Sequence, residues 1–404
     1  MRDLAITGAG LVTPIGGNVA SSWEAFCAGR LGIVRAPAST GWDGWWAGIP
    51  DAHLAGRLDP ATAKRTDRFV QYALIAAGEA LAGAALTPDP ERTAVVLGST
   101  MGGVPSLADA RSLLDGGGPT RVSPRLITYV IPNMAAAALA LRWGLHGPQL
   151  TISTACASSL DAIGHAARLI ERGDADVALA GGTETPLASV VAWSLQRAGA
   201  LATAKEARLA SRPFDRARTG FVMGDGGGVI VLERGAAARR RGARILGYVR
   251  GYSSLADGYH LSSPEPTGRW ESRAMRLALA EAEFGADAID AVFAHGTSTR
   301  VGDAAEICAI DAVYSERRAP IPVTSLKGHV GHSMAASGVT ALVIALCGMA
   351  ERRLVATLGT TELDPAARFD LVIGEARATE LHAVQVNAFG FGGQNASVVV
   401  ADQP

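Results

Sequence analysis

Several features that would indicate a secreted, metal-binding or membrane protein are missing from this chain. Its 404 residues include only 4 cysteines, and their positions, 27, 156, 308 and 347, have the spacing of neither a disulfide framework nor a zinc site. The longest apolar run, residues 339–350, is too short for a bilayer and is typical of a buried helix. The first residues lack the apolar core and cleavage site of a signal peptide. We therefore expect a cytoplasmic protein that does not enter a membrane.

An excess of charge of either sign is also missing. The chain has 37 Lys and Arg residues against 38 Asp and Glu residues, which gives a formal net charge of −1. This balance indicates neither nucleic acid nor an anionic membrane surface as a partner. Hydrophobic residues make up 48% and charged residues 19% of the chain, which is typical of a globular protein with a large core.

The two halves of the chain resemble each other. Residues 92–100 and 289–298 are both short apolar strands that run into a turn of glycine with serine or threonine. Residues 221–232 and 389–400 are both glycine-rich turns that lead into a β-branched strand. Continuous apolar strands predict sheets that are covered on both faces. The repeated order predicts a duplicated α/β domain with layered helices and sheets.

The same duplication predicts a domain boundary. The helix predicted after Cys156 has a counterpart in the apolar helix predicted after residues 332–338. A basic, glycine-containing run at residues 239–243 separates the two halves. We predict an N-terminal half, residues 1–240, that carries Cys156, and a C-terminal half, residues 241–404, that carries two candidate histidines.

Cys156 is the strongest candidate for a catalytic group. It follows a run of strand composition, residues 150–155, and precedes apolar residues at helical spacing over residues 160–170. A thiol at a helix N-terminus faces unpaired N–H groups and the positive end of the helix dipole, and both favour the thiolate. We expect a sulfur nucleophile that works near neutral pH without a metal. The alternative is an inert buried cysteine.

Three further segments carry groups that complement such a nucleophile. His295 ends a predicted strand, whereas Lys327 and His332 lie on a loop before a predicted helix. A histidine near a helix N-terminus stays neutral, because the dipole disfavours the imidazolium, and its N–H can donate to an oxygen that becomes negative. The glycine-rich loop 387–395 leaves backbone N–H groups free to complete an oxyanion hole with the amide of Cys156. Together these groups predict acyl transfer followed by stabilisation of an enolate.

Four motifs follow one another along the chain: TACASS at 154–159, HGTST at 295–299, K-x-x-x-G-H-S at 327–333 and N-x-F-G-F-G-G at 387–393. With them the sequence resembles the elongating β-ketoacyl-[acyl-carrier-protein] synthases of type II fatty-acid and polyketide pathways. The resemblance implies the thiolase fold, an internally duplicated α/β architecture with αβαβα layers. It also implies an acyltransferase that performs a decarboxylative Claisen condensation. No cofactor or metal is implied, because the phosphopantetheine arm of acyl carrier protein holds the substrates.

The resemblance also implies a role for individual residues. Cys156 would take the acyl chain as a thioester, and His295 and His332 would hold the malonyl thioester carbonyl. Lys327, paired with Glu306, would fix the loop, with Asp303 in support. The amides of Cys156 and Phe391 would form an oxyanion hole, and Phe391 would also act as a gate near Phe221. Met101 would bound the acyl pocket. The carrier protein would dock on Lys64, Arg65 and Arg121. Three of these roles have a plainer alternative. Lys327 could form only a structural salt bridge, Met101 could be an ordinary core residue, and the docking residues could be plain surface charge.

Several alternatives remain at this stage. A fatty-acid enzyme is expected to form a homodimer, whereas a polyketide ketosynthase would pair with a chain-length factor. A non-catalytic chain-length subunit is less favoured, because such subunits typically lack the nucleophile found here as Cys156. His329 and His332 have the spacing of a metal pair, but no cysteine or carboxylate cluster accompanies them, so we predict no metal. The acyl chain length, its oxidation state and the binding of a monovalent cation stay open.

Overall fold

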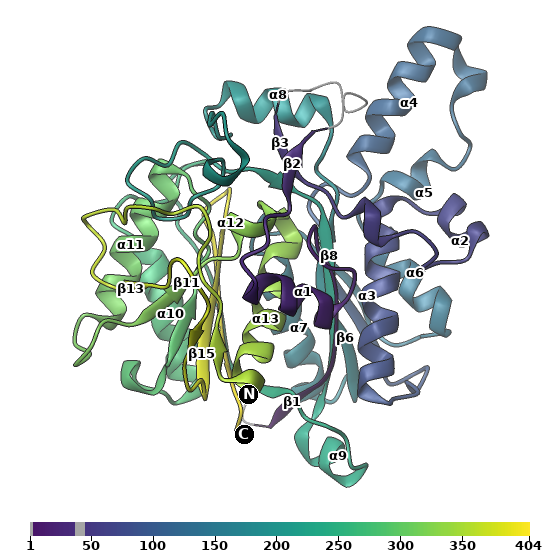
Figure 1. Ribbon diagram of the computed structural model, residues 1–404. Helices are drawn as coiled ribbons and strands as arrows, with labels where there is room; N and C mark the ends of the chain where they lie inside the picture. Colours follow the sequence, from purple (N-terminus) through teal and green to yellow (C-terminus); the bar gives the residue numbers. More distant parts are fainter. Residues whose placement is uncertain (1–2, 37–44) are drawn as a thin grey trace.

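The central feature of the fold is a sheet of eleven strands, built from two units with the same strand order (Figure 1). The structure is a computed structural model and describes residues 3–36 and 45–404. The strands of the first unit are β1 (Leu4–Val12), β4 (Thr93–Gly98), β5 (Gln149–Ile152), β6 (Val177–Glu184) and β8 (Gly226–Arg234). Those of the second are β9 (Gly247–Ala256), β10 (Ala291–Phe293), β11 (Pro322–Thr324), β13 (Asp370–Leu371), β15 (Ala383–Gly390) and β16 (Gln394–Ala401).

The strand order confirms the duplication that the sequence predicts. It is β5-β4-β6-β8-β1 in the first unit and β11-β10-β15-β16-β9 in the second, with β13 added beside β11. β1 pairs with β9 over three residues, Leu4 with Val249 to Ile6 with Gly247, and so joins the two units. Because β5 and β11 occupy equivalent places, the segments that follow them are equivalent as well. Cys156 follows β5 and His332 follows β11.

Helices form the other layers. α7 (Ser158–Arg172) and α13 (Ser337–Glu351) lie between the two sheet units (Figure 1). α3 (Arg68–Ala84) and α6 (Met134–Trp143) cover the outer face of the first unit, and α10 (Arg269–Ala282) and α11 (Arg300–Tyr314) that of the second. This is the predicted αβαβα arrangement. β4 is buried along its whole length, as expected for a parallel strand covered on both faces.

The inner helices are mostly buried because they touch a sheet on both sides. α13 is apolar on nearly every side, whereas α7 carries the buried Asp161 and exposes His165. The stretch Met334–Glu351, which includes α13, is long and apolar enough to cross a membrane by composition alone, but 78% of it is buried inside the protein. α13 also packs closely against α7. A Cβ atom on Gly338 would lie 2.6 Å from Cγ of Leu160, so only glycine fits there without movement. The contact places the start of α13 beside the segment that carries Cys156.

The remaining elements surround this core. The helices are α1 (Val19–Cys27), α2 (Pro60–Arg65), α4 (Val104–Gly117), α5 (Leu126–Val130), α8 (Ser189–Arg197), α9 (Gly235–Arg240) and α12 (Lys327–Val330). The short strands are β2 (Ile33–Arg35), β3 (Trp46–Gly48), β7 (Met223–Gly224), β12 (Arg353–Leu354) and β14 (Arg377–Ala378). α4, α5 and α8 lie at one end of the molecule, shown at the top of Figure 1.

Candidate active site

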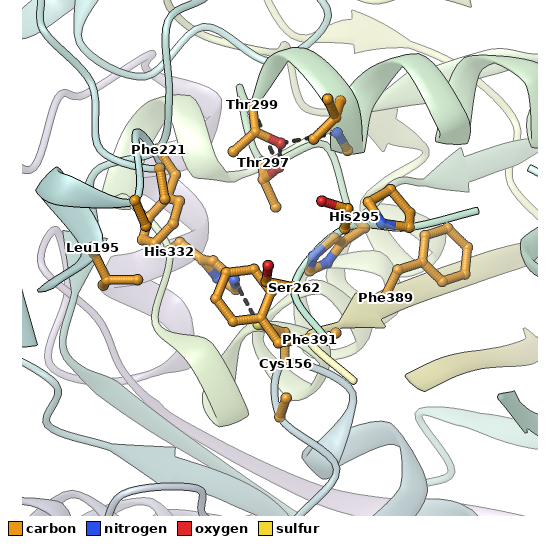
Figure 2. A pocket seen from close by; sticks show the side chains of 18 of the residues that line it. Cys156, Leu195, Phe221, Ser262, His295, Thr297, Thr299, His332, Phe389 and Phe391 are labelled. Carbon is orange, nitrogen blue, oxygen red and sulfur yellow. Dashed lines mark hydrogen bonds between the residues drawn. The ribbon is translucent and has the colours of Figure 1, made fainter. Parts of the chain in front are cut away.

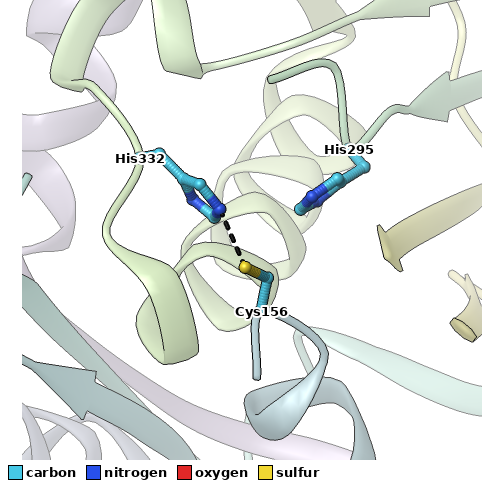
Figure 3. A group of neighbouring side chains, drawn as sticks. All are labelled: Cys156, His295 and His332. Atoms are coloured by element: carbon cyan, nitrogen blue, oxygen red, sulfur yellow. Dashed lines mark hydrogen bonds between the residues drawn. The ribbon is translucent and has the colours of Figure 1, made fainter. Parts of the chain in front are cut away.

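The structure brings Cys156, His295 and His332 together from three distant parts of the chain. Nε2 of His332 lies 3.0 Å from Sγ of Cys156. The centroids of the two imidazole rings are 5.3 Å apart. Both rings point toward the sulfur, from different sides (Figure 3). The convergence expected of a nucleophile with two hydrogen-bond donors is therefore present.

Cys156 lies on a tight turn between β5 and α7. Ala155 takes a left-handed backbone conformation with a φ of 49°, which is unusual for a residue with a side chain. The hydroxyl of Ser158 accepts from the N–H of Thr154 at 2.9 Å and donates to the carbonyl of Ala155 at 2.6 Å. The hydroxyl of Thr154 in turn donates to the carboxylate of Asp161. These bonds hold the strained turn, and with it the position of the sulfur.

The expected thiolate is not the state that this environment favours. Burial raises the pKa of the Cys156 thiol to about 11, although the positive charge of Lys327 and the N–H groups of Phe391 and Cys156 act in the opposite direction. The loss of hydration outweighs the stabilisation that sequence reasoning attributed to the helix N-terminus. The sulfur therefore carries its proton at neutral pH, and a base must take that proton when the sulfur attacks.

His295 is held from two sides by charged groups. The carboxyl group of Glu306 accepts from the N–H groups of His295 and Gly296 at 2.7 and 2.6 Å. Nζ of Lys327 donates to the carbonyl of His295 and lies 3.4 Å from its Nδ1. Within the described part of the chain no salt bridge joins Lys327 to Glu306, but their charges still interact, because each shifts the pKa of the other. With a cation at Nδ1, the ring proton of His295 belongs on Nε2.

Burial and nearby cations keep both histidines neutral. Burial lowers the pKa of His295 well below its usual value, and the charge of Lys327 lowers it further. Burial and Lys327 have the same effect on the pKa of His332. Neutrality was predicted, but its main cause is burial rather than a helix dipole. Lys327 itself is buried, and this lowers the pKa of its ammonium group, whereas Glu306 acts to raise it.

Asp303 and Ser337 support the two histidine segments. Asp303 accepts from the N–H of Ser298 at 3.0 Å and from that of Phe214 at 2.7 Å, which holds the turn after His295. The hydroxyl of Ser337 lies 2.9 Å from Nδ1 of His332. Sequence reasoning did not select Ser337. The sequence places Ser337 five residues after His332, at the start of the predicted apolar helix, and this position could have indicated a contact between the two side chains.

A cavity of about 710 Å³ connects these groups to solvent. Figure 2 shows Leu195 and Phe221 on the left, Thr297 and Thr299 at the top, and Ser262 in the middle beside Phe391. Met101, Phe221 and Phe391 all line the cavity, as their predicted roles require. The ring of Phe221 packs edge-on against that of His332, at 5.4 Å between centroids. Phe391 is 48% exposed, and its role as a gate stays a prediction.

The predicted docking residues lie away from the cavity wall. Lys64 and Arg65 end α2, and Arg121 ends a short 3₁₀ helix, Pro119–Arg121. All three side chains are exposed. Their positions are compatible with a docking surface and with ordinary surface charge, so their role stays a prediction.

The same three central residues have donor atoms that could hold a metal. The sulfur and one nitrogen of each histidine lie within 4.8 Å of one another, and zinc accepts these ligand types. The ammonium group of Lys327, 3.4 Å from Nδ1 of His295, opposes a further cation at this place. The interpretation without a metal stays a prediction.

Comparison with known proteins gives one consistent result. The chain matches the family descriptions "Beta-ketoacyl synthase, N-terminal domain" over residues 1–238 and "Beta-ketoacyl synthase, C-terminal domain" over residues 246–361. It is 35% identical to 3-oxoacyl-[acyl-carrier-protein] synthase 2 of Staphylococcus aureus (strain COL), with 98% of each chain covered.

Two similar solved structures contain ketosynthases. One is a type II PKS acyl-carrier protein in complex with its ketosynthase bound to the hexaketide, with a TM-score of 0.90 and 27% identity. The other is the ishigamide ketosynthase/chain length factor, with a TM-score of 0.90 and 28% identity. Each comparison covers 100% of both chains.

Proposed function

The chain belongs to the β-ketoacyl synthase family, and we propose that it joins an acyl chain held on Cys156 to malonyl-acyl carrier protein by decarboxylative Claisen condensation. The observation that carries this proposal is the convergence of Cys156, His295 and His332 at the wall of one cavity. The chain is thus an acyltransferase, and an inert cysteine would not need two neutral imidazoles beside it. A non-catalytic chain-length subunit is disfavoured for the same reason.

In the first half-reaction the thiol of Cys156 attacks the acyl thioester. Its proton passes to Nε2 of His332, 3.0 Å away, as a new carbon–sulfur bond forms. The bond to the carrier sulfur breaks, and the leaving sulfur takes that proton back from His332. The N–H groups of Cys156 and Phe391 stabilise the negative oxygen of the tetrahedral intermediate.

In the second half-reaction malonyl-carrier protein loses carbon dioxide. The electron pair of the broken carbon–carbon bond passes into an enolate, whose oxygen accepts hydrogen bonds from the Nε2–H groups of His295 and His332. The enolate carbon then attacks the acyl carbonyl on Cys156. The carbon–sulfur bond breaks, the sulfur takes one proton from solvent, and 3-oxoacyl-carrier protein leaves.

The proposed reaction requires a carrier protein as a partner. We propose that an acidic carrier protein docks on Lys64, Arg65 and Arg121, because opposite charges speed encounter without demanding tight binding. Its phosphopantetheine arm brings the substrate, so no resident cofactor or metal is needed. We also propose that the chain works in the cytoplasm and that residues 1–240 and 241–404 act as its two halves.

A dimer is proposed on the free edge of the sheet. β5 is the last strand in the sheet order, and its Leu150 is 41% exposed. Nearby on the first unit, Leu141 of α6 is 85% and Ile127 of α5 is 63% exposed. Unpaired strand edges and exposed apolar residues favour pairing with a second chain. That chain is a second copy in fatty-acid synthesis, or a chain-length factor in polyketide synthesis.

The condensation itself provides the test. Purified protein given acyl-carrier protein and malonyl-carrier protein should form one 3-oxoacyl-carrier protein for each carbon dioxide released. His295→Ala and His332→Ala should each lower the decarboxylation rate by roughly a hundredfold, which is the usual loss when one oxyanion donor is removed. Folded variants that still decarboxylate at the wild-type rate would contradict the assigned roles. Native mass measurement from the source cell separates the two dimers.

A further inference from the structure

Glu271 is a buried acidic residue for which the proposed reaction has no role. It lies in the first turn of α10 and is only 2% exposed. One of its carboxyl oxygens, Oε2, is buried and has no hydrogen-bond partner among residues 3–36 and 45–404. Glu271 nevertheless lines the cavity that contains Cys156. A buried carboxyl without a partner is costly for folding, so its presence at a cavity wall indicates a ligand.

A structural role at the helix end does not account for Glu271. The carboxylate of Glu265 accepts from the N–H of Arg269, the first residue of α10, at 3.2 Å. The N–H of Ser272 bonds to the carbonyl of Gly268 at 2.9 Å. Other residues thus serve the backbone at the start of the helix, and the carboxyl group of Glu271 stays free for the cavity.

The surroundings of Glu271 favour its neutral form. Burial raises the pKa of Glu271 well above its usual value, and nearby carboxylates raise it further. These carboxylates are Glu306 and Asp303 on α11, and Asp257 and Glu265 on the segment between β9 and α10. A neutral carboxylic acid has one O–H donor, which a carboxylate lacks. The acidic neighbours also oppose a negatively charged ligand at this place.

Polar residues of the cavity wall are linked to Glu271 through two of these carboxylates. Asp257 accepts from Nδ2 of Asn395 at 2.6 Å, and Asp303 accepts from the hydroxyl of Thr297 at 3.3 Å. Asn395 and Thr297 line the cavity together with Glu271. Leu195 and Leu201 contribute apolar lining to the same cavity. A hydrogen-bond donor among polar neighbours fits a neutral carbonyl oxygen rather than an alkyl chain.

We propose that Glu271 determines substrate binding by donating a hydrogen bond to a neutral carbonyl oxygen of the pantetheine-bound substrate in this cavity. The inference rests on the proposed function only for the class of ligand. Such a carbonyl has two sources: an amide of the pantetheine arm, or a ketone on the acyl chain.

The test measures binding alone, in a Cys156→Ala background that cannot be acylated. The ligands are hexanoyl-pantetheine and 3-oxohexanoyl-pantetheine, which differ by one ketone, and calorimetric titration gives each Kd. Glu271→Leu removes the donor and should raise the Kd by roughly threefold to tenfold, the usual effect of one lost hydrogen bond. Glu271→Gln keeps an N–H donor and should restore most of the affinity. Glu24→Leu, on the exposed side of α1, is the matched control.

Each outcome has one meaning. An equal rise in Kd for both ligands assigns the bond to a carbonyl of the pantetheine thioester that both share, and a rise for the 3-oxo ligand alone assigns it to the acyl ketone. A folded Glu271→Leu protein with unchanged Kd for both ligands overturns the inference. Because binding is measured without chemistry, failure of the proposed condensation would appear separately, as a wild-type protein that is not acylated.

Discussion

The contact between Ser337 and His332 leads to a prediction for both half-reactions. To take the proton of Cys156, Nε2 of His332 must be unprotonated, whereas to stabilise the enolate it must carry a proton. The hydroxyl of Ser337, 2.9 Å from Nδ1, can accept from Nδ1 in the first case and donate to it in the second. It also lies 3.3 Å from the hydroxyl of Ser333, which can complete the chain of hydrogen bonds. Ser337 thus supports both tautomers.

Ser337→Ala should therefore slow acylation and decarboxylation together. One buried hydrogen bond contributes about 0.5–1.5 kcal/mol, which corresponds to roughly a twofold to thirteenfold loss in each rate. Intact-mass kinetics of Cys156 acylation and release of carbon dioxide from malonyl-carrier protein measure the two steps. The control is Ser253→Ala, since the hydroxyl of Ser253 is also buried but bonds to the carbonyl of Ala274 at 2.6 Å.

The reasoning fails if Ser337→Ala keeps both rates at the wild-type level while the control is equally active. It also fails if only one rate falls. In that case a single tautomer of His332 would serve the enzyme, and the hydroxyl would not act in both directions.

Two further predictions concern chain length and stability. Met101→Phe should raise the KM for long acyl chains by at least about fivefold, because a larger side chain at the end of the acyl pocket costs roughly 1–3 kcal/mol when the chain reaches it. The KM for butanoyl substrates should change little. Equal effects at all chain lengths would contradict the role of Met101 as the end of the pocket. Burial raises the pKa of Asp225 from 3.8 to about 7, so the native state holds this proton to higher pH than the unfolded state. Stability should therefore fall as pH rises from about 4 to 7, by on the order of 4 kcal/mol for this group. Asp225→Asn should remove that fall when urea unfolding is compared at pH 5 and 8, and an unchanged pH dependence would contradict the assignment.

Sequence reasoning reached most of the fold because the signals for its elements are local. The glycine-rich turns and β-branched strands at residues 221–232 and 389–400 occur in the same order as the elements around them, and this predicts the duplication. The pairing of β1 with β9, which joins the two units into one sheet, was not predicted. This pairing depends on the register between two strands that lie more than half of the chain length apart in sequence, and no local pattern encodes that register.

The candidate site divides in the same way. Cys156, His295 and His332 were found because each lies in a distinct motif at the end of a strand or the start of a helix. The thiolate expectation was wrong because burial, which raises the pKa of Cys156 to about 11, depends on the whole fold. Ser337 and Glu271 were missed for a related reason: each gains meaning only from what lies beside it in the folded chain.

The most direct test of the central claim is the intact mass of the protein after exposure to an acyl-carrier protein. The wild-type chain should gain the mass of one acyl group, released by hydroxylamine as a thioester would be, and Cys156→Ala should gain none. Acylation of Cys156→Ala to the wild-type level, or a folded wild-type chain that gains no mass, would contradict the account.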